Sequence, residues 1–454
     1  MFHSRAVRRA LFILGCMAAQ AVHAQGPQPT AVVVENVRIF DGTSARLSAP
    51  SNVLVVGNVI QAISTDPIAD PTGASVIRIQ GGGRTVMPGL IDNHVHIFMS
   101  ASRQEDMLDP KTTPEILQSR AAEEATLMLL RGFTSARDMG GPVFDFKRSI
   151  DQGKTVGPRI YPSGAMVSQT SGHGDSRLPS ERSRRFFGVA SKGEFLGVNF
   201  IADGRDEVLT ATRENLRFGA SQIKVMAGGG AASAYDPLDE TQYTLDEMLA
   251  AVQAADDWGT YVTVHAYTPK AVRRAVEAGI KCIEHGQLLD EPTMKLLAKK
   301  GIWLSLQALD EAPESQAADV KAKKHTVVEG TDNAFKWARK HKVKLAWGTD
   351  FMFAPANNKN QNADILKLKQ WLTSFETLKL VTHDNAQLLA LSGPRNPYPG
   401  KLGVVREGAL ADLLLVDGNP LENIQLIADP ARNFVVTMKD GKIYKNTVRQ
   451  GTSQ

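Results

Sequence analysis

The chain has 454 residues, of which 43% are apolar and 22% charged, with 52 Lys and Arg against 48 Asp and Glu and a net charge of +4 at pH 7. This composition is typical of a globular protein and excludes a disordered chain, a coiled coil and a disulfide-stapled fold. The near balance of charges disfavours a nucleic-acid partner, and the length predicts one large domain with a smaller one.

Residues 1–24 are expected to form a cleaved secretory signal peptide. Three arginines precede residues 10–22, which are almost wholly apolar, and small side chains lead up to Ala24. The apolar run is shorter than the roughly 20 residues of a transmembrane helix. Cleavage predicts a periplasmic or secreted protein with no membrane contact, and it leaves Cys282 as an unpaired cysteine. Lipid attachment at Cys16 is the alternative.

Short β-branched runs near both ends of the chain predict strands of a small antiparallel sheet. These runs are residues 31–37, 53–60 and 75–80 near the N-terminus and residues 413–416, 434–439 and 441–444 near the C-terminus. We expect residues 25–86 and 395–454 to build one composite β-sandwich domain from both chain ends.

Eight short apolar runs alternate with helical patterns in the middle of the chain. The runs are residues 86–96, 134–138, 159–164, 222–227, 261–267, 282–286, 302–307 and 344–350, and the clearest helical patterns are 114–131, 245–258 and 269–278. This order predicts βα units and a (β/α)₈ TIM barrel over residues 87–394. A doubly wound sheet is the alternative, but no GxGxxG motif follows the first strand.

Side chains that bind metals stand at the C-terminal ends of several predicted barrel strands, where the active sites of such barrels lie. Alternate residues of a strand share a face, so His94 and His96 can bind the same ion. Two histidines on one strand are weak evidence alone, but four of the ten histidines fall at such ends. Imidazole nitrogen and carboxylate oxygen are typical zinc ligands. The candidate ligands are His94, His96, Lys224, His265, His285 and Asp350.

Lys224 has two interpretations. A lysine on a buried strand can be salt-bridged or extend its ammonium to solvent. Alternatively, a desolvated lysine has a lowered pKa and can react with CO₂ to give a carbamate. Such a carbamate could bridge two divalent ions about 3.5 to 4 Å apart. We favour the carbamate with two ions, most simply Zn²⁺, although another divalent ion would also suit these ligands.

Two loop residues are further candidates for catalysis. His173 follows the third predicted strand and Tyr235 follows the fourth. Either could hydrogen-bond a tetrahedral oxyanion or a substrate carboxylate. The alternative is that His173 is an exposed loop histidine and Tyr235 a packed loop aromatic, neither with a role in catalysis. The glycines at residues 228–230 either let backbone amides approach an anion or form a tight turn. Arg137 and Asp138 are expected to pair with each other.

Five segments resemble the amidohydrolase superfamily. They are residues 86–96 (VMPGLIDNHVH), 132–138, 222–230, 347–350 (WGTD) and 403–421. The resemblance is to the branch with a carboxylated lysine, which contains Xaa-Pro and Xaa-Arg/Lys carboxypeptidases and imidazolonepropionase-like proteins. Residues 228–237 are similar to bacterial ochratoxin-degrading amidohydrolases.

The resemblance implies roles for the six candidate ligands. The more buried ion is held by His94, His96 and Asp350, the second ion by His265 and His285, and carboxylated Lys224 bridges both. Asp350 also transfers protons. A homo-oligomer, such as an octamer, is implied as well.

We therefore expect a metal-dependent amidohydrolase that cleaves the amide before a C-terminal amino acid in dipeptides or N-acyl amino acids. Ochratoxin A, with release of phenylalanine, is an expected substrate, and the attacking group is a metal-bridging hydroxide. Hydrolysis of a cyclic amide or ester is the alternative, since one metal pair serves many electrophiles. A non-catalytic scaffold is a further alternative, but it predicts missing ligands, whereas the set is complete.

Overall fold

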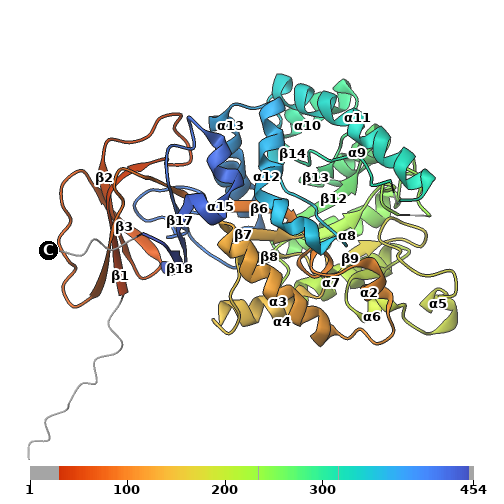
Figure 1. The fold of residues 1–454 in the computed structure, drawn as a ribbon. Helices are drawn as coiled ribbons and strands as arrows, with labels where there is room; N and C mark the ends of the chain where they lie inside the picture. The colour runs from red at the N-terminus through yellow and green to blue at the C-terminus, as the bar shows by residue number, and fades with distance from the viewer. Residues whose placement is uncertain (1–29, 234, 315, 449–454) are drawn as a thin grey trace, which may run out of the picture.

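The computed structural model describes residues 30–233, 235–314 and 316–448 (Figure 1). The expected signal peptide and Cys16 lie outside these ranges. A parallel barrel forms the larger lobe, and a sheet built from both ends of the chain forms the smaller lobe beside it (Figure 1). Within the described ranges, no helix is long and apolar enough to cross a membrane.

The barrel contains the predicted parallel strands in chain order. They are β6 (Leu90–Val95), β7 (Phe133–Asp138), β8 (Arg159–Pro162), β9 (Met166–Ser168), β11 (Ile223–Met226), β12 (Val262–Ala266), β13 (Cys282–His285), β14 (Trp303–Leu306) and β15 (Lys344–Trp347). The ladders run β6-β7-β8 and β9-β11-β12-β13-β14-β15. The N–H of Ser221 donates to Pro162 O at 2.8 Å and that of Asp350 to His94 O at 2.8 Å, which joins the two ladders. The predicted (β/α)₈ fold is confirmed.

The third barrel position differs from the prediction of one strand over residues 159–164. The chain bends at Gly164, whose φ of 76° is accessible to glycine without strain, so β8 pairs with β7 and β9 pairs with β11. The connection from β9 to the next long helix holds α5 (Arg184–Phe187), α6 (Lys192–Phe195) and β10 (Asn199–Ile201). His173 lies at the start of this connection.

The smaller lobe is one sheet with the strand order β18-β17-β16-β5-β1-β2-β3 and with β4 beside β1. Its strands are β1 (Thr30–Ile39), β2 (Ser51–Val56), β3 (Val59–Ser64), β4 (Ser75–Gln80), β5 (Thr85–Pro88), β16 (Leu413–Val416), β17 (Phe434–Lys439) and β18 (Lys442–Asn446). The first half of β1 pairs with β2 and β4, whereas its end pairs with β5. The sheet therefore folds over a shared core that includes Val53, Ile60, Leu415 and Met438.

Three predictions for the strands of this lobe are wrong in detail. The sheet is mixed, because β1 pairs in parallel with both β4 and β5. Residues 53–60 are not one strand, because Gly57 and Asn58 form the turn between β2 and β3. Residues 86–96 supply both β5 and β6, and the chain changes sheets at Gly89. A Cβ at Gly89 would lie 2.1 Å from Thr134 Oγ1, so this crossing requires glycine.

Helices alternate with the strands around the barrel (Figure 1). The main helices are α3 (Pro114–Leu130), α4 (Val143–Asp151), α7 (Arg205–Phe218), α8 (Leu245–Asp257), α9 (Pro269–Ala278), α10 (Glu291–Lys300), α11 (Ala318–His341), α13 (Ser374–Lys379) and α14 (Asn385–Leu389). The shorter ones are α1 (Ile97–Ser100), α2 (Gln104–Leu108), α12 (Gln361–Ile365) and α15 (Pro430–Asn433), with helical turns at η1 (Pro355–Asn360), η2 (Leu366–Gln370), η3 (Leu380–Asp384), η4 (Ala390–Arg395) and η5 (Ile424–Ala428).

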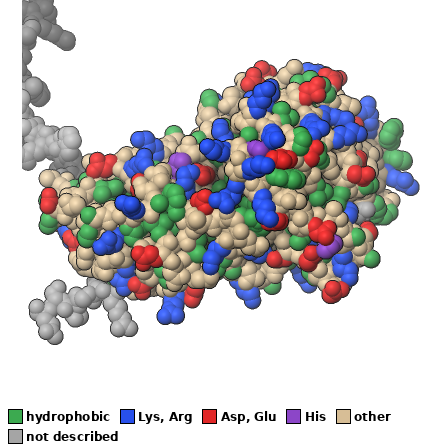
Figure 2. Space-filling view, turned by 90° about the horizontal axis from the view of Figure 1, so that it is seen from above, with side chains coloured by type: hydrophobic (Ala, Val, Ile, Leu, Met, Phe, Trp, Pro, Cys, Tyr) green, Lys and Arg blue, Asp and Glu red, His purple; other side chains and the backbone are tan. Residues whose placement is uncertain are grey.

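The two lobes are joined by a buried ion pair as well as by apolar packing. Arg159 of β8 donates from Nε to Asp412 Oδ2 at 2.8 Å and from Nη2 to Asp440 Oδ1 at 2.7 Å. Leu414 and Phe434 of the smaller lobe belong to the same buried cluster as the barrel core. On the face seen in Figure 2, Lys and Arg side chains are interspersed with Asp and Glu.

Candidate metal centre

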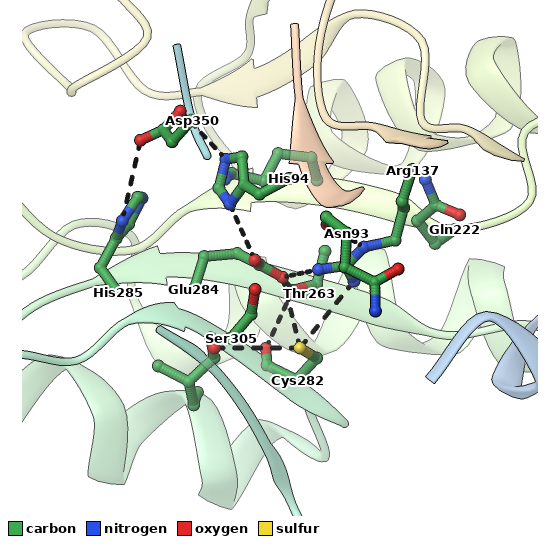
Figure 3. Close-up of polar contacts among 12 residues, drawn as sticks. Asn93, His94, Arg137, Gln222, Thr263, Cys282, Glu284, His285, Ser305 and Asp350 are labelled. Atoms are coloured by element: carbon green, nitrogen blue, oxygen red, sulfur yellow. Dashed lines mark hydrogen bonds and ion pairs between the residues drawn. The ribbon is translucent and has the colours of Figure 1, made fainter. Parts of the chain in front are cut away.

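The strand ends of the barrel bring three of the candidate ligands together. One ligand atom from each of His94, His285 and Asp350 lies within 4.8 Å of the other two. Asp350 Oδ1 is 3.4 Å from His94 Nε2 and 3.4 Å from His96 Nε2, and its Oδ2 is 3.9 Å from His285 Nδ1. The ring centroids of His265 and His285 are 4.4 Å apart. These five residues therefore surround one small space (Figure 3, which labels His94, His285 and Asp350).

Each of the four histidines uses one ring nitrogen to contact an oxygen acceptor. The contacts are His94 Nδ1 to Glu284 Oε2 at 2.9 Å, His96 Nδ1 to Gly140 O at 3.3 Å, His265 Nε2 to Gly229 O at 3.1 Å and His285 Nδ1 to Gln307 Oε1 at 2.8 Å. A carbonyl or carboxylate oxygen only accepts, so the facing nitrogen carries the proton and the other nitrogen has a lone pair. This arrangement is typical of histidines that bind a metal.

Burial keeps three of these imidazoles, those of His94, His265 and His285, in the neutral form that a metal requires. It lowers the pKa of His94 to about 4, although Asp350 and Glu284 oppose the shift. Burial also lowers the pKa values of His265 and His285 well below the usual range, and the neighbouring histidines add to the effect. Near neutral pH, lone pairs rather than positive charges therefore face the site.

Two candidate ligands stand in strained backbone at the ends of their strands. His285 and Asp350 have φ values of 78° and 55°, in the left-handed region that non-glycine residues rarely adopt. Such strain is concentrated at functional sites. Asp350 Oδ1 is buried and accepts no hydrogen bond within the described part of the chain. An orphaned carboxylate oxygen beside two imidazole lone pairs fits a divalent cation.

Lys224 on β11 lies beside this cluster, with Nζ 3.5 Å from His94 Nε2. Only 1% of the residue is exposed, so the ammonium does not extend to solvent. Within the parts of the chain that the structure describes, Lys224 forms no salt bridge, so it is neither salt-bridged nor solvent-exposed. Burial lowers the pKa of Lys224, and Arg137 adds to this, whereas Glu284 and Asp350 oppose it.

A buried ion pair beneath the ligands was missed by sequence reasoning. Arg137 Nη2 donates to Glu284 Oε1 at 2.7 Å, and both side chains are 0% exposed (Figure 3). Burial would raise the pKa of Glu284, but Arg137 and His94 outweigh it and hold the pKa well below the usual range. The expected Arg137–Asp138 pair is wrong, because Asp138 accepts from the N–H of Ile97 at 2.9 Å instead. Residue alternation on β13 would not have found the buried ion pair, because the adjacent His285 was expected to face inward; the positive φ of His285 breaks the alternation and lets both side chains face the barrel interior.

Glu284→Gln should weaken metal binding and destabilise the fold. Loss of the partner that orients a ligand histidine typically lowers metal affinity about 10- to 100-fold. Breaking a buried ion pair costs about 3 to 5 kcal/mol, because Arg137 would keep an uncompensated charge. Metal content after dialysis against a weak chelator, together with thermal unfolding, checks both effects. Glu277→Gln, at an exposed position on α9, is the control. Unchanged metal retention in Glu284→Gln would contradict this role.

His173 joins the cluster from the connection after β9. Its ring stacks on that of His265, with the centroids 4.0 Å apart and the planes 24° from parallel. Its Nδ1 lies 3.0 Å from Asp236 Oδ2 and 2.8 Å from Ser233 Oγ. The carboxylate of Asp236 fixes the ring and leaves Nε2 available for a substrate, much as a buried aspartate orients a catalytic histidine.

Tyr235 does not join the cluster, contrary to expectation. Its side chain is 60% exposed, whereas the next residue, Asp236, is buried and turned inward to His173. The glycines before it are needed for close packing. A Cβ would lie 1.8 Å from Pro237 O at Gly229 and 1.8 Å from His173 Nδ1 at Gly230.

Comparisons with known proteins agree with this geometry. A model of the amidohydrolase family matches residues 85–444. Ochratoxinase of Aspergillus niger is 32% identical over 371 residues, which cover 79% of this chain and 75% of that protein. A prolidase complexed with N-methylphosphonate-L-proline is 32% identical, with a TM-score of 0.82 over 92% of this chain and 100% of the other. A Xaa-Pro dipeptidase with methionine bound in the active site is 27% identical, with a TM-score of 0.77 over 92% and 100% of the two chains.

The family match covers the barrel, all six candidate ligands and the C-terminal strands of the smaller lobe, and the relatives match over most of their own length. The chain shares its overall fold with these solved structures. The chain is a hydrolase that belongs to the amidohydrolase family.

Proposed function

We propose that the protein hydrolyses the amide before a C-terminal amino acid in dipeptides and N-acyl amino acids, including ochratoxin A. The observation that carries the proposal is the convergence of His94, His285 and Asp350 beside the buried amine of Lys224. The names of the relatives support an amide substrate, because ochratoxinase and prolidase both stand among them. Export to the periplasm or beyond is part of the proposal.

The residues present fit two divalent ions. The residues that would hold them are His94, His96, Asp350, His265, His285 and a carboxylated Lys224. Bound ions would lower the pKa of a water towards neutrality and polarise the scissile carbonyl. The neutral imidazoles supply nitrogen lone pairs, and conversion of the Lys224 amine to a carbamate would replace a positive charge by two oxygen donors.

Asp350 and His173 would act directly on the substrate. The pKa of Asp350 lies below the usual range of a carboxyl group, so the carboxylate is ionised and able to accept a proton. With Oδ1 directed at His94 and His96, Oδ2 would take the proton of the attacking water and pass it to the leaving amine. His173, whose ring is held in place by Asp236 and Ser233, would place Nε2 against the oxygen of the tetrahedral intermediate.

The test measures metal per chain and amino-acid release on protein purified without chelator. The panel contains N-acyl derivatives of phenylalanine, proline and lysine, ochratoxin A, and a set of lactams and lactones. Two ions per chain with release of a free amino acid are the expected result. Turnover of only lactams or lactones would replace the proposal with cyclic amide or ester hydrolysis. A chain without ions or activity after metal addition would be a scaffold.

A further inference from the structure

Helix α11 places a lysine near the candidate metal centre. Val327 of this helix is fully buried, in one cluster with Tyr267. The ring of Tyr267 lies 5.0 Å from that of His265 and 5.2 Å from that of His285. Lys324 precedes Val327 by three residues, so the two side chains share one face of the helix. That face is turned towards Tyr267, whose ring lies beside the two histidines.

The same end of α11 also contacts the loop that orients His173. Lys323 donates from Nζ to Ser233 O and to Asp236 O, the latter at 3.3 Å. Ser233 and Asp236 are the two residues that hold His173 Nδ1. The early turns of α11 therefore border the space between the ligand histidines and His173.

Lys324 differs from its basic neighbours because its ammonium contacts neither a carboxylate nor a backbone carbonyl within the described residues, whereas Lys323 donates to two carbonyls. Lys321 pairs with Glu314 at 2.9 Å, and Lys367 pairs with Asp310 at 2.6 Å and also with Asp364. Lys324 is partly buried and forms no salt bridge within the parts of the chain that the structure describes.

The surroundings of Lys324 agree with this position. Burial lowers the pKa of Lys324, and Asp350 is the first of the carboxylates that oppose the shift, ahead of Asp310. Lys324 and Asp350 form no direct ion pair within the described residues. A partly buried cation without a partner is unfavourable until an anion binds to it.

We infer that Lys324 binds the free C-terminal carboxylate of the substrate and so selects substrates that end in an unblocked amino acid. This inference rests on the proposed function. In an N-acyl amino acid the carboxylate is attached to the carbon next to the scissile nitrogen. An ammonium beside the metal centre can therefore hold the carboxylate while the amide lies over the ligands. A hydrogen bond between two ionised groups is stronger than one between neutral groups. The contact between the Lys324 ammonium and the substrate carboxylate would therefore contribute substantially to specificity.

The test compares N-acetyl-phenylalanine with N-acetyl-phenylalaninamide, in which the carboxylate is replaced by a neutral group. Acetate release from each is measured for the unchanged enzyme and for Lys324→Gln and Lys324→Arg. Lys321→Gln, on the same helix but paired with Glu314, is the matched control. Metal content and thermal unfolding are recorded for every variant. Neither should change in the Lys324 variants, because Lys324 is neither a proposed ion ligand nor part of the hydrophobic core.

The unchanged enzyme should prefer the free acid. Lys324→Gln should lose about 10- to 100-fold in kcat/KM for the acid, mainly through KM, and change little for the carboxamide. Lys324→Arg should restore part of the loss, and Lys321→Gln should behave like the unchanged enzyme. If Lys324→Gln keeps the full preference for the acid, or lowers both substrates equally, the inference is wrong. If the unchanged enzyme cleaves neither substrate nor any other acyl amino acid, the proposed function fails instead.

Discussion

Lys224→Ala should abolish metal binding and amide hydrolysis together. In the proposed centre the carbamate of Lys224 contributes an oxygen to each ion, so its removal weakens both sites at once. Without the ions, water keeps a pKa near 15.7 and is a poor nucleophile at neutral pH. We expect kcat/KM to fall by at least about 10³-fold, with fewer than two ions retained per chain. Metal analysis and hydrolysis of N-acyl amino acids on one preparation check this.

Chemical rescue separates the carbamate from a merely structural role for Lys224. A short carboxylic acid added to Lys224→Ala could occupy the vacated space and supply the missing oxygens, so acetate or propionate with divalent metal should restore part of the activity. Lys281→Ala, at an exposed position, is the control and should match the unchanged enzyme. Two tightly bound ions and full activity in Lys224→Ala would exclude Lys224 as a ligand.

Asp350→Asn should reduce kcat far more than it reduces stability. Asparagine cannot accept the proton that Asp350 Oδ2 is proposed to carry, and general acid–base catalysis is typically worth about 10² to 10⁴ in rate. Asparagine has nearly the same shape and tolerates the φ of 55° at this position, so the strained turn should persist. kcat and KM under saturating metal, with thermal unfolding, check both parts.

Two further variants make the Asp350 experiment interpretable. Asp350→Ala removes the ligand oxygen and places a residue less suited to positive φ in the turn, so it should lose stability as well as activity. Asp257→Asn changes an exposed acid at the end of α8 and should change neither. A kcat of Asp350→Asn close to that of the unchanged enzyme would rule out Asp350 as the group that transfers the proton.

The sequence by itself determined the barrel and most of the residues of its candidate metal centre, because both depend on short-range patterns. Helix α9 begins at Pro269 and ends at Ala278 as predicted, since Thr268 caps its first turn and Gly279 adopts the left-handed conformation at its end. The candidate ligands at the strand ends could be predicted from one rule, that the C-terminal ends of parallel strands meet at one edge of the sheet. The likeness of residues 86–96 to a known family added the roles of the histidines.

Only the tertiary structure decided which distant groups face one another. Arg137 and Glu284 are 147 residues apart, and nothing near either one indicates that they form the buried pair beneath His94. His173 lies in the site, whereas Tyr235 does not. The side chain of Asp236 turns inward to contact His173, and the adjacent side chain of Tyr235 is exposed to solvent. Local sequence sets backbone conformation and strand faces, whereas contacts across the barrel depend on how all the strands close together. For the same reason, the unpaired charge of Lys324 becomes visible only when α11 is packed against the barrel.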